Sequence, residues 1–216
     1  MDFSLTDEQQ QFLKSLREFL INEIAPHAAE MDRTETFRRE NLKALAEFGY
    51  LGLNFPEAYG GTNADFLTAT IAGIELSRTC AATALSAGAS VALCGYPILQ
   101  YGTAEQRQNY LPKLISGQWM GAMALTEPGA GSDLASITTR AERQGDKFIV
   151  NGTKTYITNG TLADVILTFV VTTGEDGQRG YSLLLIEGAA KGLSRGRKLE
   201  KMGVRGSPTR DRKSVV

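Results

Sequence analysis

Histidines, cysteine clusters and basic targeting residues are scarce in this sequence of 216 residues, and each scarcity excludes a class of protein. The N-terminal MDFSLTDEQQ has neither the basic region nor the apolar region of a secretory signal peptide. Cys80 and Cys94 are the two cysteines, they form no CxxC motif, and there is a single histidine. This pattern argues against a zinc site or a disulfide framework and fits a reducing compartment. We therefore expect a cytoplasmic protein without a bound metal.

An excess of charge of one sign is also lacking, since 23 Lys and Arg residues stand against 24 Asp and Glu residues. This balance gives no reason to expect a nucleic-acid partner. The charge is unevenly spread, because residues 191–216 hold nine basic and two acidic side chains. That basic segment faces either an anionic ligand or, in the simpler interpretation, solvent.

Residues 79–104 contain no charged side chain at all. Thr, Ser, Gly, Gln and Pro97 interrupt the stretch, so it lacks the dense apolar run of a membrane-spanning helix. We expect a buried helix with a face of small residues, and no membrane span.

The first half of the chain has helical periodicity and the second half has the pattern of strands. Thr6 with Gln9, and Thr103 with Gln106, form capping boxes at the starts of two helices. We expect Pro26 to end the first of these helices. The expected helices cover residues 6–25, about 39–48, a segment from 67, a segment from 79, and 103–117.

After residue 118 the sequence consists of short runs rich in Val, Ile, Thr and aromatic residues, separated by Gly-Asp, Asn-Gly and other Gly-rich turns. Six such runs occupy residues 119–125, 138–144, 147–152, 154–160, 164–173 and 181–188. Their regular spacing predicts a small antiparallel β-barrel or sandwich. The fold class is thus α+β, with an all-α domain over residues 1–118, a middle β domain over 119–210, and an atypical tail over 211–216.

The stretch ALTEPGAGSDLAS, residues 124–136, is a glycine-rich loop after an apolar run. Gly129 and Gly131 supply two glycines of a dinucleotide-binding turn, but Leu134 replaces the third and a β-rich segment follows in place of a helix. No Walker motif occurs. The loop either binds an anion through its backbone N–H groups and Ser132, or it is an ordinary connection between strands.

A second polar stretch, NGTKTYITNG, occupies residues 151–160. Tyr156 and Thr158 are two residues apart, so on a strand they share one face. They provide either an aromatic wall beside a hydroxyl donor for a planar ligand, or an ordinary cross-strand pair.

These two stretches together resemble the acyl-CoA dehydrogenase family. Other segments agree in the same order: LTDEQQQF, LAEFGYLGLNFPEAYGG, YGTAEQRQNYLPKLISGQWMGAMALTEPGAGSD and KLEKMGVRGSPT. The resemblance extends to about residue 209. It implies an N-terminal helical domain, a middle β domain, and FAD held between the β domain and a C-terminal helical domain.

The resemblance also assigns site residues. It implies that Leu125 offers backbone groups to the flavin pyrimidine ring and that Thr126 offers a hydroxyl. It places Ser132 near the flavin pyrophosphate and the acyl-CoA. It places Thr158 near flavin N5, with Tyr156 covering the ring where many members carry tryptophan. The complete set implied for the cofactor is Met123, Leu125, Thr126, Gly131, Ser132, Tyr156, Ile157 and Thr158.

The activity implied by the resemblance is α,β-dehydrogenation of acyl-CoA thioesters, in which a hydride passes from the β-carbon to flavin N5. Family members form homo-oligomers, dimers or tetramers, and many pass electrons to an electron-transferring flavoprotein. Two alternatives remain open. One is an acyl-CoA oxidase or a nitroalkane oxidase-like flavoenzyme on the same fold, and the other is a non-catalytic fragment that binds acyl-CoA.

The sequence departs from the family pattern at its end. Family members are much longer, and their third, helical domain carries the catalytic glutamate. Where an apolar strand usually follows RGSPT, this sequence has RDRKSVV, which resembles a truncation or a frame error. We therefore assign no catalytic residue in this chain, and expect Glu127 to have no proton-abstracting role and His27 to be structural. We also expect the chain alone to bind FAD poorly and to be inactive.

Overall fold

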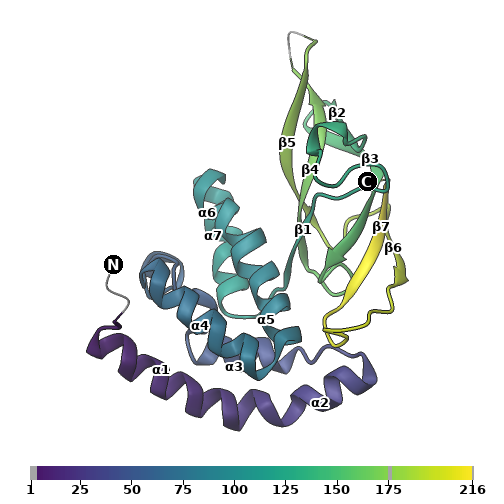
Figure 1. Cartoon of the computed structure of the whole chain (residues 1–216). Coiled ribbons are helices and arrows are strands. Elements are labelled where there is room, and N and C mark those ends of the chain that lie inside the picture. The colour runs from purple at the N-terminus through teal and green to yellow at the C-terminus, as the bar shows by residue number, and fades with distance from the viewer. Residues whose placement is uncertain (1–3, 175–176, 216) are drawn as a thin grey trace. The chain divides into compact units, whose positions relative to one another are not determined.

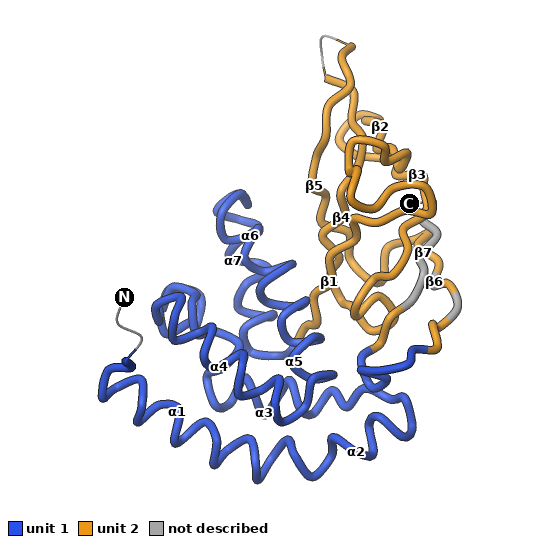
Figure 2. Tube along the Cα trace, in the orientation of Figure 1, with its two compact units in different colours: residues 1–118, 201–207 blue, residues 119–200, 208–216 orange. Residues whose placement is uncertain are grey.

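The computed structural model describes residues 4–174 and 177–215, which fold into two compact units (Figure 2). Unit 1 comprises residues 1–118 and 201–207, and unit 2 comprises residues 119–200 and 208–216. Helices make up unit 1 and a β-sheet dominates unit 2 (Figure 1). The expected α+β fold class is confirmed.

Unit 1 is built from α-helices joined by short π and 3-10 segments. The α-helices are α1 (Asp7–Phe19), α2 (Ala25–Thr34), α3 (Glu40–Glu47), α4 (Phe66–Thr79), α5 (Ala81–Gly88), α6 (Tyr96–Tyr101) and α7 (Ala104–Ile115). The π segments are η1 (Leu20–Ile24) and η4 (Ala89–Gly95), and the 3-10 segments are η2 (Tyr50–Gly52) and η3 (Glu57–Tyr59).

Both predicted capping boxes are present and begin the helices that the sequence indicates. The Gln9 backbone N–H donates to Thr6 Oγ1 at 3.2 Å, and the Thr6 N–H donates back to Gln9 Oε1 at 3.1 Å. Thr103 and Gln106 repeat the arrangement at the start of α7. These bonds satisfy N–H groups that the first helical turn leaves without an intrahelical acceptor.

Pro26 does not end the first helix, which corrects the sequence prediction. The chain passes through the π turn of η1 and continues directly into α2 (Figure 1), with Pro26 in the first turn of that helix. The π turn immediately before the proline, in which the Ala25 N–H donates to the Leu20 carbonyl, lets the helix continue past a residue that has no N–H to donate. Burial on the apolar face continues across the turn at Leu20 and Ile24.

The uncharged segment forms α5, η4 and α6. Among the described residues it is the one helix, Ala81–Tyr101, that is long and apolar enough to cross a membrane by length and composition. Half of its most apolar window is buried inside the structure, and core helices of soluble proteins meet the same criteria. The expectation that it spans no membrane stays a prediction.

Unit 2 holds a seven-stranded sheet in the described residues. The strands are β1 (Gly121–Ala124), β2 (Arg140–Gln144), β3 (Lys147–Thr158), β4 (Val165–Thr173), β5 (Arg179–Glu187), β6 (Leu193–Lys198) and β7 (Thr209–Val215), with a 3-10 turn η5 (Leu134–Ser136) after β1. The order across the sheet is β1-β4-β2-β3-β7-β6, and β5 pairs with β4.

The sheet is mixed, whereas the sequence spacing predicts a wholly antiparallel one. β4 runs parallel to β1 and to β2, and the other pairs are antiparallel. Regular spacing of short runs favours hairpins between sequence neighbours, but β1 pairs with β4 and β3 with β7. Partners that are distant in sequence leave no local signal of their direction.

Residues 147–158 form the single strand β3, although the sequence predicts two strands separated by a turn at Asn151-Gly152. Gly152 lies inside the strand, where the neighbouring Thr139 leaves no room for a side chain. A Cβ on Gly152 would meet Thr139 Cγ2 at 2.6 Å and Thr139 Oγ1 at a still shorter distance. The glycine therefore serves close packing rather than a turn.

Two segments near the C-terminus do not follow a simple division of the chain at residue 118, and the expected domain bounds stay a prediction. Residues 201–207, assigned to the middle domain from sequence, belong to unit 1. There the Arg205 N–H donates to Asp32 Oδ1 at 3.1 Å, and the Ser207 and Ser86 hydroxyls are bonded at 3.2 Å. Residues 211–215 of the expected tail continue strand β7, and Val216 lies outside the described residues.

Candidate functional site

The glycine-rich loop, residues 125–132, follows β1 directly and is bonded to strand β3. The Thr155 N–H donates to the Thr126 carbonyl at 2.8 Å. Within the loop, the Glu127 N–H donates to the Ala130 carbonyl at 2.8 Å, and the reverse bond measures 3.2 Å. The two polar stretches singled out from sequence are therefore neighbours in unit 2.

A buried ion pair strengthens this connection. Lys154 Nζ, on β3, lies 2.9 Å from Glu127 Oε1 and also donates to the Leu125 carbonyl at 2.8 Å. The lysine side chain is 2% exposed and the glutamate side chain 3%. The carboxylate accepts three more bonds: from the Thr138 N–H and hydroxyl at 2.7 Å each, and from the Thr139 N–H at 2.9 Å. The loop is thus fixed to β3 on one side and to residues 138–139 on the other.

The electrostatics of the pair favour a charged Glu127. Burial raises the pKa of the carboxyl, but hydrogen bonds from Thr139, Lys154 and Thr138 outweigh it and bring the pKa from its ordinary 4.5 down to about 2. Burial lowers the pKa of Lys154, and Glu127 opposes that effect. A carboxylate held by so many donors is a poor general base, which agrees with the expectation that Glu127 abstracts no proton.

A β-bulge in β3 changes the simple alternation expected around Tyr156. The register with β7 shifts between Lys154 and Ile157, and both Lys154 and Thr155 are buried. Tyr156 then has a φ of +58°, in the left-handed region, and its side chain is 66% exposed. Such a backbone conformation costs a non-glycine residue about 1–3 kcal/mol and is concentrated at functional sites.

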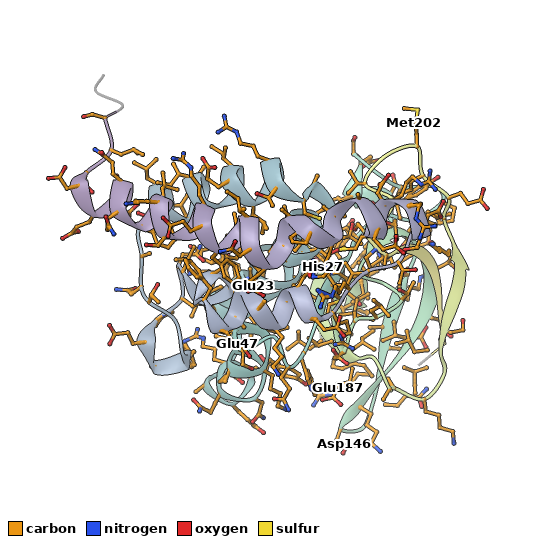
Figure 3. The ribbon with its side chains drawn as sticks, turned by 90° about the horizontal axis from the view of Figure 1, so that it is seen from below. Glu23, His27, Glu47, Asp146, Glu187 and Met202 are labelled. Atoms are coloured by element: carbon orange, nitrogen blue, oxygen red, sulfur yellow. The ribbon has the colours of Figure 1, made fainter. Side chains whose placement is uncertain are left out.

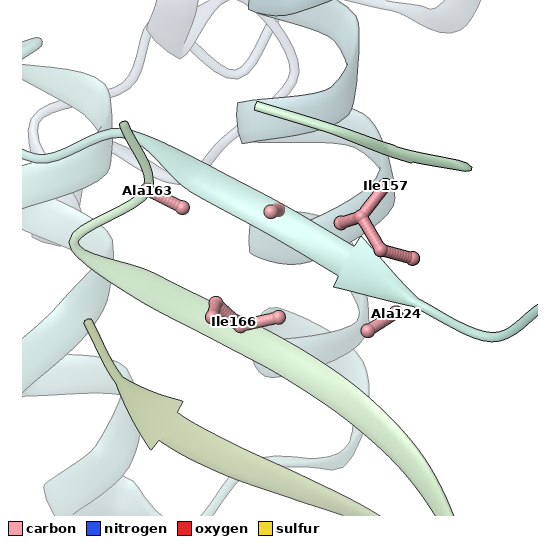
Figure 4. Packing of buried hydrophobic residues seen from close by; sticks show 5 residues of the cluster. Ala124, Ile157, Ala163 and Ile166 are labelled. Atoms are coloured by element: carbon pink, nitrogen blue, oxygen red, sulfur yellow. The ribbon is translucent and has the colours of Figure 1, made fainter. Parts of the chain in front are cut away.

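The other residues predicted to bind the cofactor differ in how far their side chains are exposed to solvent. Ile157 is 2% exposed and packs with Ala122, Ala124, Ala163 and Ile166 (Figure 4), so it has only backbone atoms to offer a ligand. The half-buried predicted residues are Met123, Leu125, Thr126 and Thr158, and the exposed ones are Gly131, Ser132 and Tyr156.

The segment after the loop is shaped by its own side chains. Asp133 accepts from the Ala135 N–H at 3.1 Å and from the Ser136 hydroxyl. From β5, Arg179 Nη2 donates to the carbonyls of Ala135 and Ile137 at 2.9 Å each, and the Tyr181 hydroxyl donates to the Ala135 carbonyl at 2.9 Å. The carboxylate of Asp133 is therefore directed into its own turn.

Sequence reasoning missed Lys154 and Arg179 as parts of this site. A lysine in the middle of a strand between two threonines looks like a solvated side chain, yet Lys154 lies on the same face of β3 as the buried Val150. The signal that could have found it is Glu127, since a carboxylate beside buried strand residues requires a partner.

No group of His, Cys, Asp and Glu side chains able to hold a metal ion occurs in the described part of the chain. His27 lies on α2 in unit 1 and is half-buried (Figure 3). Its expected structural role stays a prediction.

The loop has features that fit a flavin nucleotide. A Cβ added at Gly129 or Gly131 would meet nothing within 4 Å, so a ligand can approach the backbone there. Among the described residues, hydrogen bonds use the carbonyls of Leu125 and Thr126 but not their N–H groups. The Thr155 hydroxyl is buried and has no hydrogen-bond partner in the described structure. The donor set therefore suits a ligand with pyrimidine-type acceptors and a pyrophosphate.

The buried pair predicts a specific acid sensitivity for unit 2. Because the folded-state pKa of Glu127 is about 2, below its ordinary 4.5, its stabilising contribution is complete above pH 4.5 and is lost as pH falls toward 2. We expect wild type to lose more stability between pH 6 and pH 3 than the double variant Glu127→Gln/Lys154→Met. Urea unfolding followed by the fluorescence of Trp119, the single tryptophan and a residue of unit 2, measures this. Parallel pH profiles would contradict the prediction.

Comparison with known proteins agrees with these features. Residues 6–118 match the acyl-CoA dehydrogenase N-terminal domain, and residues 122–213 match the acyl-CoA dehydrogenase middle domain. The chain therefore belongs to the acyl-CoA dehydrogenase family.

Individual acyl-CoA dehydrogenases are similar to this chain in sequence and structure. The short-chain specific acyl-CoA dehydrogenase of Clostridium acetobutylicum is 43% identical over 209 residues, which cover 97% of this chain and 55% of that protein. Butyryl-CoA dehydrogenase from Megasphaera elsdenii has a structure similar to this one, with a TM-score of 0.91, 36% identity, and coverage of 100% of this chain and 57% of that one. An acyl-CoA dehydrogenase from Bacillus anthracis, solved in complex with FAD, has a TM-score of 0.88 at 31% identity, and the match covers 98% of this chain and 36% of that one. The chain thus spans about half the length of the first two of these relatives.

Proposed function

We propose that this chain binds FAD and acyl-CoA in a flavin-dependent α,β-dehydrogenation of acyl-CoA thioesters. The observation that carries the proposal is the bonding of the loop to β3 through Thr126–Thr155 and Glu127–Lys154. The family resemblance assigns both stretches to the flavin, and this bonding holds them next to each other.

The proposed division of labour follows from exposure and bonding. Leu125 and Thr126 donate to the pyrimidine ring, the exposed Gly131 and Ser132 lie along the pyrophosphate, and Ser132 also contacts acyl-CoA. Tyr156 covers the flavin ring, Ile157 contributes backbone atoms, Thr158 donates near N5, and Met123 lies beside the cofactor. When bound, FAD supplies the acceptor for the hydride that leaves the β-carbon. Donors fixed in a site that excludes water stabilise the charge that the cofactor gains.

The general base is proposed to lie outside these residues. Glu127 is buried in its ion pair, and Asp133 bonds to its own turn. We therefore expect the 216-residue chain, mixed with FAD and a series of acyl-CoAs without oxygen, to show no flavin bleaching. Rapid bleaching with any acyl-CoA would show that the chain contains its own base.

Several properties of the whole enzyme belong to the same proposal. The electron acceptor is an electron-transferring flavoprotein, the protein is a cytoplasmic homo-oligomer, a dimer or a tetramer, and it contacts neither nucleic acid nor the membrane interior. Reduced enzyme that is reoxidised by oxygen faster than by the flavoprotein would favour the alternative, an oxidase on the same fold.

The central test is FAD binding by this chain and by Ser132→Phe. The bulky ring would prevent the backbone at 131–132 from approaching the pyrophosphate, so we expect FAD affinity to fall at least about tenfold, or about 1.4 kcal/mol. Quenching of flavin fluorescence on titration gives the Kd. Gln144→Phe, at an exposed position of β2, is the matched control and should bind as wild type. Equal affinity of wild type and Ser132→Phe would place the pyrophosphate elsewhere.

A further inference from the structure

The buried ion pair has a defined orientation. Lys154 Nζ, its positive end, touches the Leu125 carbonyl at 2.8 Å. Glu127, its negative end, is bonded on its other side to the amides and hydroxyl of Thr138 and Thr139 at 2.7–2.9 Å. Lys154 Nζ therefore contacts a backbone carbonyl of the glycine-rich loop directly, while the Glu127 carboxylate is also held by uncharged donors from residues 138–139.

The contacted carbonyl belongs to the peptide unit that joins Leu125 to Thr126, and the N–H of that unit is the Thr126 amide. A cation bonded to a peptide oxygen polarises the group and makes its N–H a stronger donor. The effect is stronger here than it would be at the surface, because both charged side chains are almost completely buried and charges interact more strongly where water is excluded. The next carbonyl, that of Thr126, is fixed at 2.8 Å by the Thr155 N–H, so the peptide cannot turn away.

We propose that Lys154 is a positioning residue that holds the Leu125–Thr126 peptide toward the flavin and, through it, stabilises the reduced cofactor more than the oxidised one, with Glu127 keeping the lysine in place. The inference rests on the proposed function, because it concerns the same flavin site. Reduced flavin carries extra negative charge on its pyrimidine side, so a donor strengthened by a cation favours that form.

A purely structural pair would behave differently. Buried ion pairs can often be replaced by neutral residues of similar size with little loss of stability. The double variant Glu127→Gln/Lys154→Met removes both charges together, so neither charge remains buried without a partner. The double variant therefore distinguishes a loss of folding stability from a change in affinity for the flavin.

The experiment measures the Kd of the 216-residue chain for oxidised FAD and for chemically reduced FAD under anaerobic conditions. We expect the double variant to unfold at nearly the wild-type urea concentration, and its affinity for reduced FAD to fall about fivefold to tenfold more than its affinity for oxidised FAD, since a charge-assisted hydrogen bond is lost. Lys147→Met, an exposed lysine on the same strand, is the matched control and should leave both affinities unchanged. Amide hydrogen exchange of residues 125–132 in the FAD-free chain shows whether the loop itself has loosened.

Each outcome decides between the two proposals. A folded double variant that binds both forms of FAD as wild type does, or loses both equally, overturns this inference and leaves the proposed function standing. A wild-type chain that binds neither form contradicts the proposed function itself.

Discussion

Replacing Lys154 by methionine alone should lower the free energy of unfolding of unit 2 by about 3–5 kcal/mol, because it leaves Glu127 as a buried carboxylate without its cationic partner. The remaining bonds from Thr138 and Thr139 cannot supply the missing positive charge. Urea unfolding at pH 7, followed by Trp119 fluorescence, measures the loss.

The control for this prediction is again Lys147→Met, which removes an exposed lysine from the same strand and should change stability by less than about 0.5 kcal/mol. Adding Glu127→Gln to Lys154→Met should restore most of the lost stability. A single variant within about 1 kcal/mol of wild type would mean that Glu127 takes up a proton or finds another partner at little cost.

Gly152→Ala should destabilise unit 2 by about 1–3 kcal/mol, or prevent its folding, because the new methyl group would overlap the buried side chain of Thr139. The overlap would also displace the Thr139 amide, which donates to Glu127 at 2.9 Å, so the glycine-rich loop should loosen as well. Thermal unfolding and amide exchange at 125–132 report the two effects separately.

A second glycine in unit 2 provides the comparison. Gly180 lies inside β5, and a Cβ there would meet its nearest neighbour, Thr172 Oγ1, at an ordinary 3.6 Å. Gly180→Ala should therefore be nearly neutral. Combining Gly152→Ala with Thr139→Gly should recover part of the loss, and failure of that rescue would show that the backbone, not the Thr139 side chain, limits the space.

Local signals in the sequence predicted those parts of the fold that depend on neighbours along the chain. The capping boxes at Thr6 and Thr103 were correctly predicted because each is complete within four residues. Gly152 and Pro26 were misinterpreted, since each is a strong local signal of a break. In this fold, close packing against Thr139 accounts for Gly152, and the π turn before Pro26 lets the helix continue.

The candidate site shows the same limit. The two stretches are recognisable in the sequence, but their connection depends on the buried contact of Lys154 with Glu127, two residues that are far apart in sequence. The bulge that follows Lys154 in β3 has no reliable sequence signature either. The left-handed backbone of Tyr156 was equally hidden, because large aromatic residues rarely adopt that conformation. Tertiary contacts that outweigh local preference cannot be inferred from periodicity.

The return of residues 201–207 to unit 1 has a consequence for synthesis on the ribosome. The helices up to residue 118 emerge first, yet the bonds that Arg205 and Ser207 make with Asp32 and Ser86 must wait until the whole of β1 to β6 has been translated. At about 5–20 residues per second, that delay is roughly 4–17 s. During this interval the nascent helical unit lacks its last segment. The completion of unit 1 is therefore tied in time to the translation of the sheet.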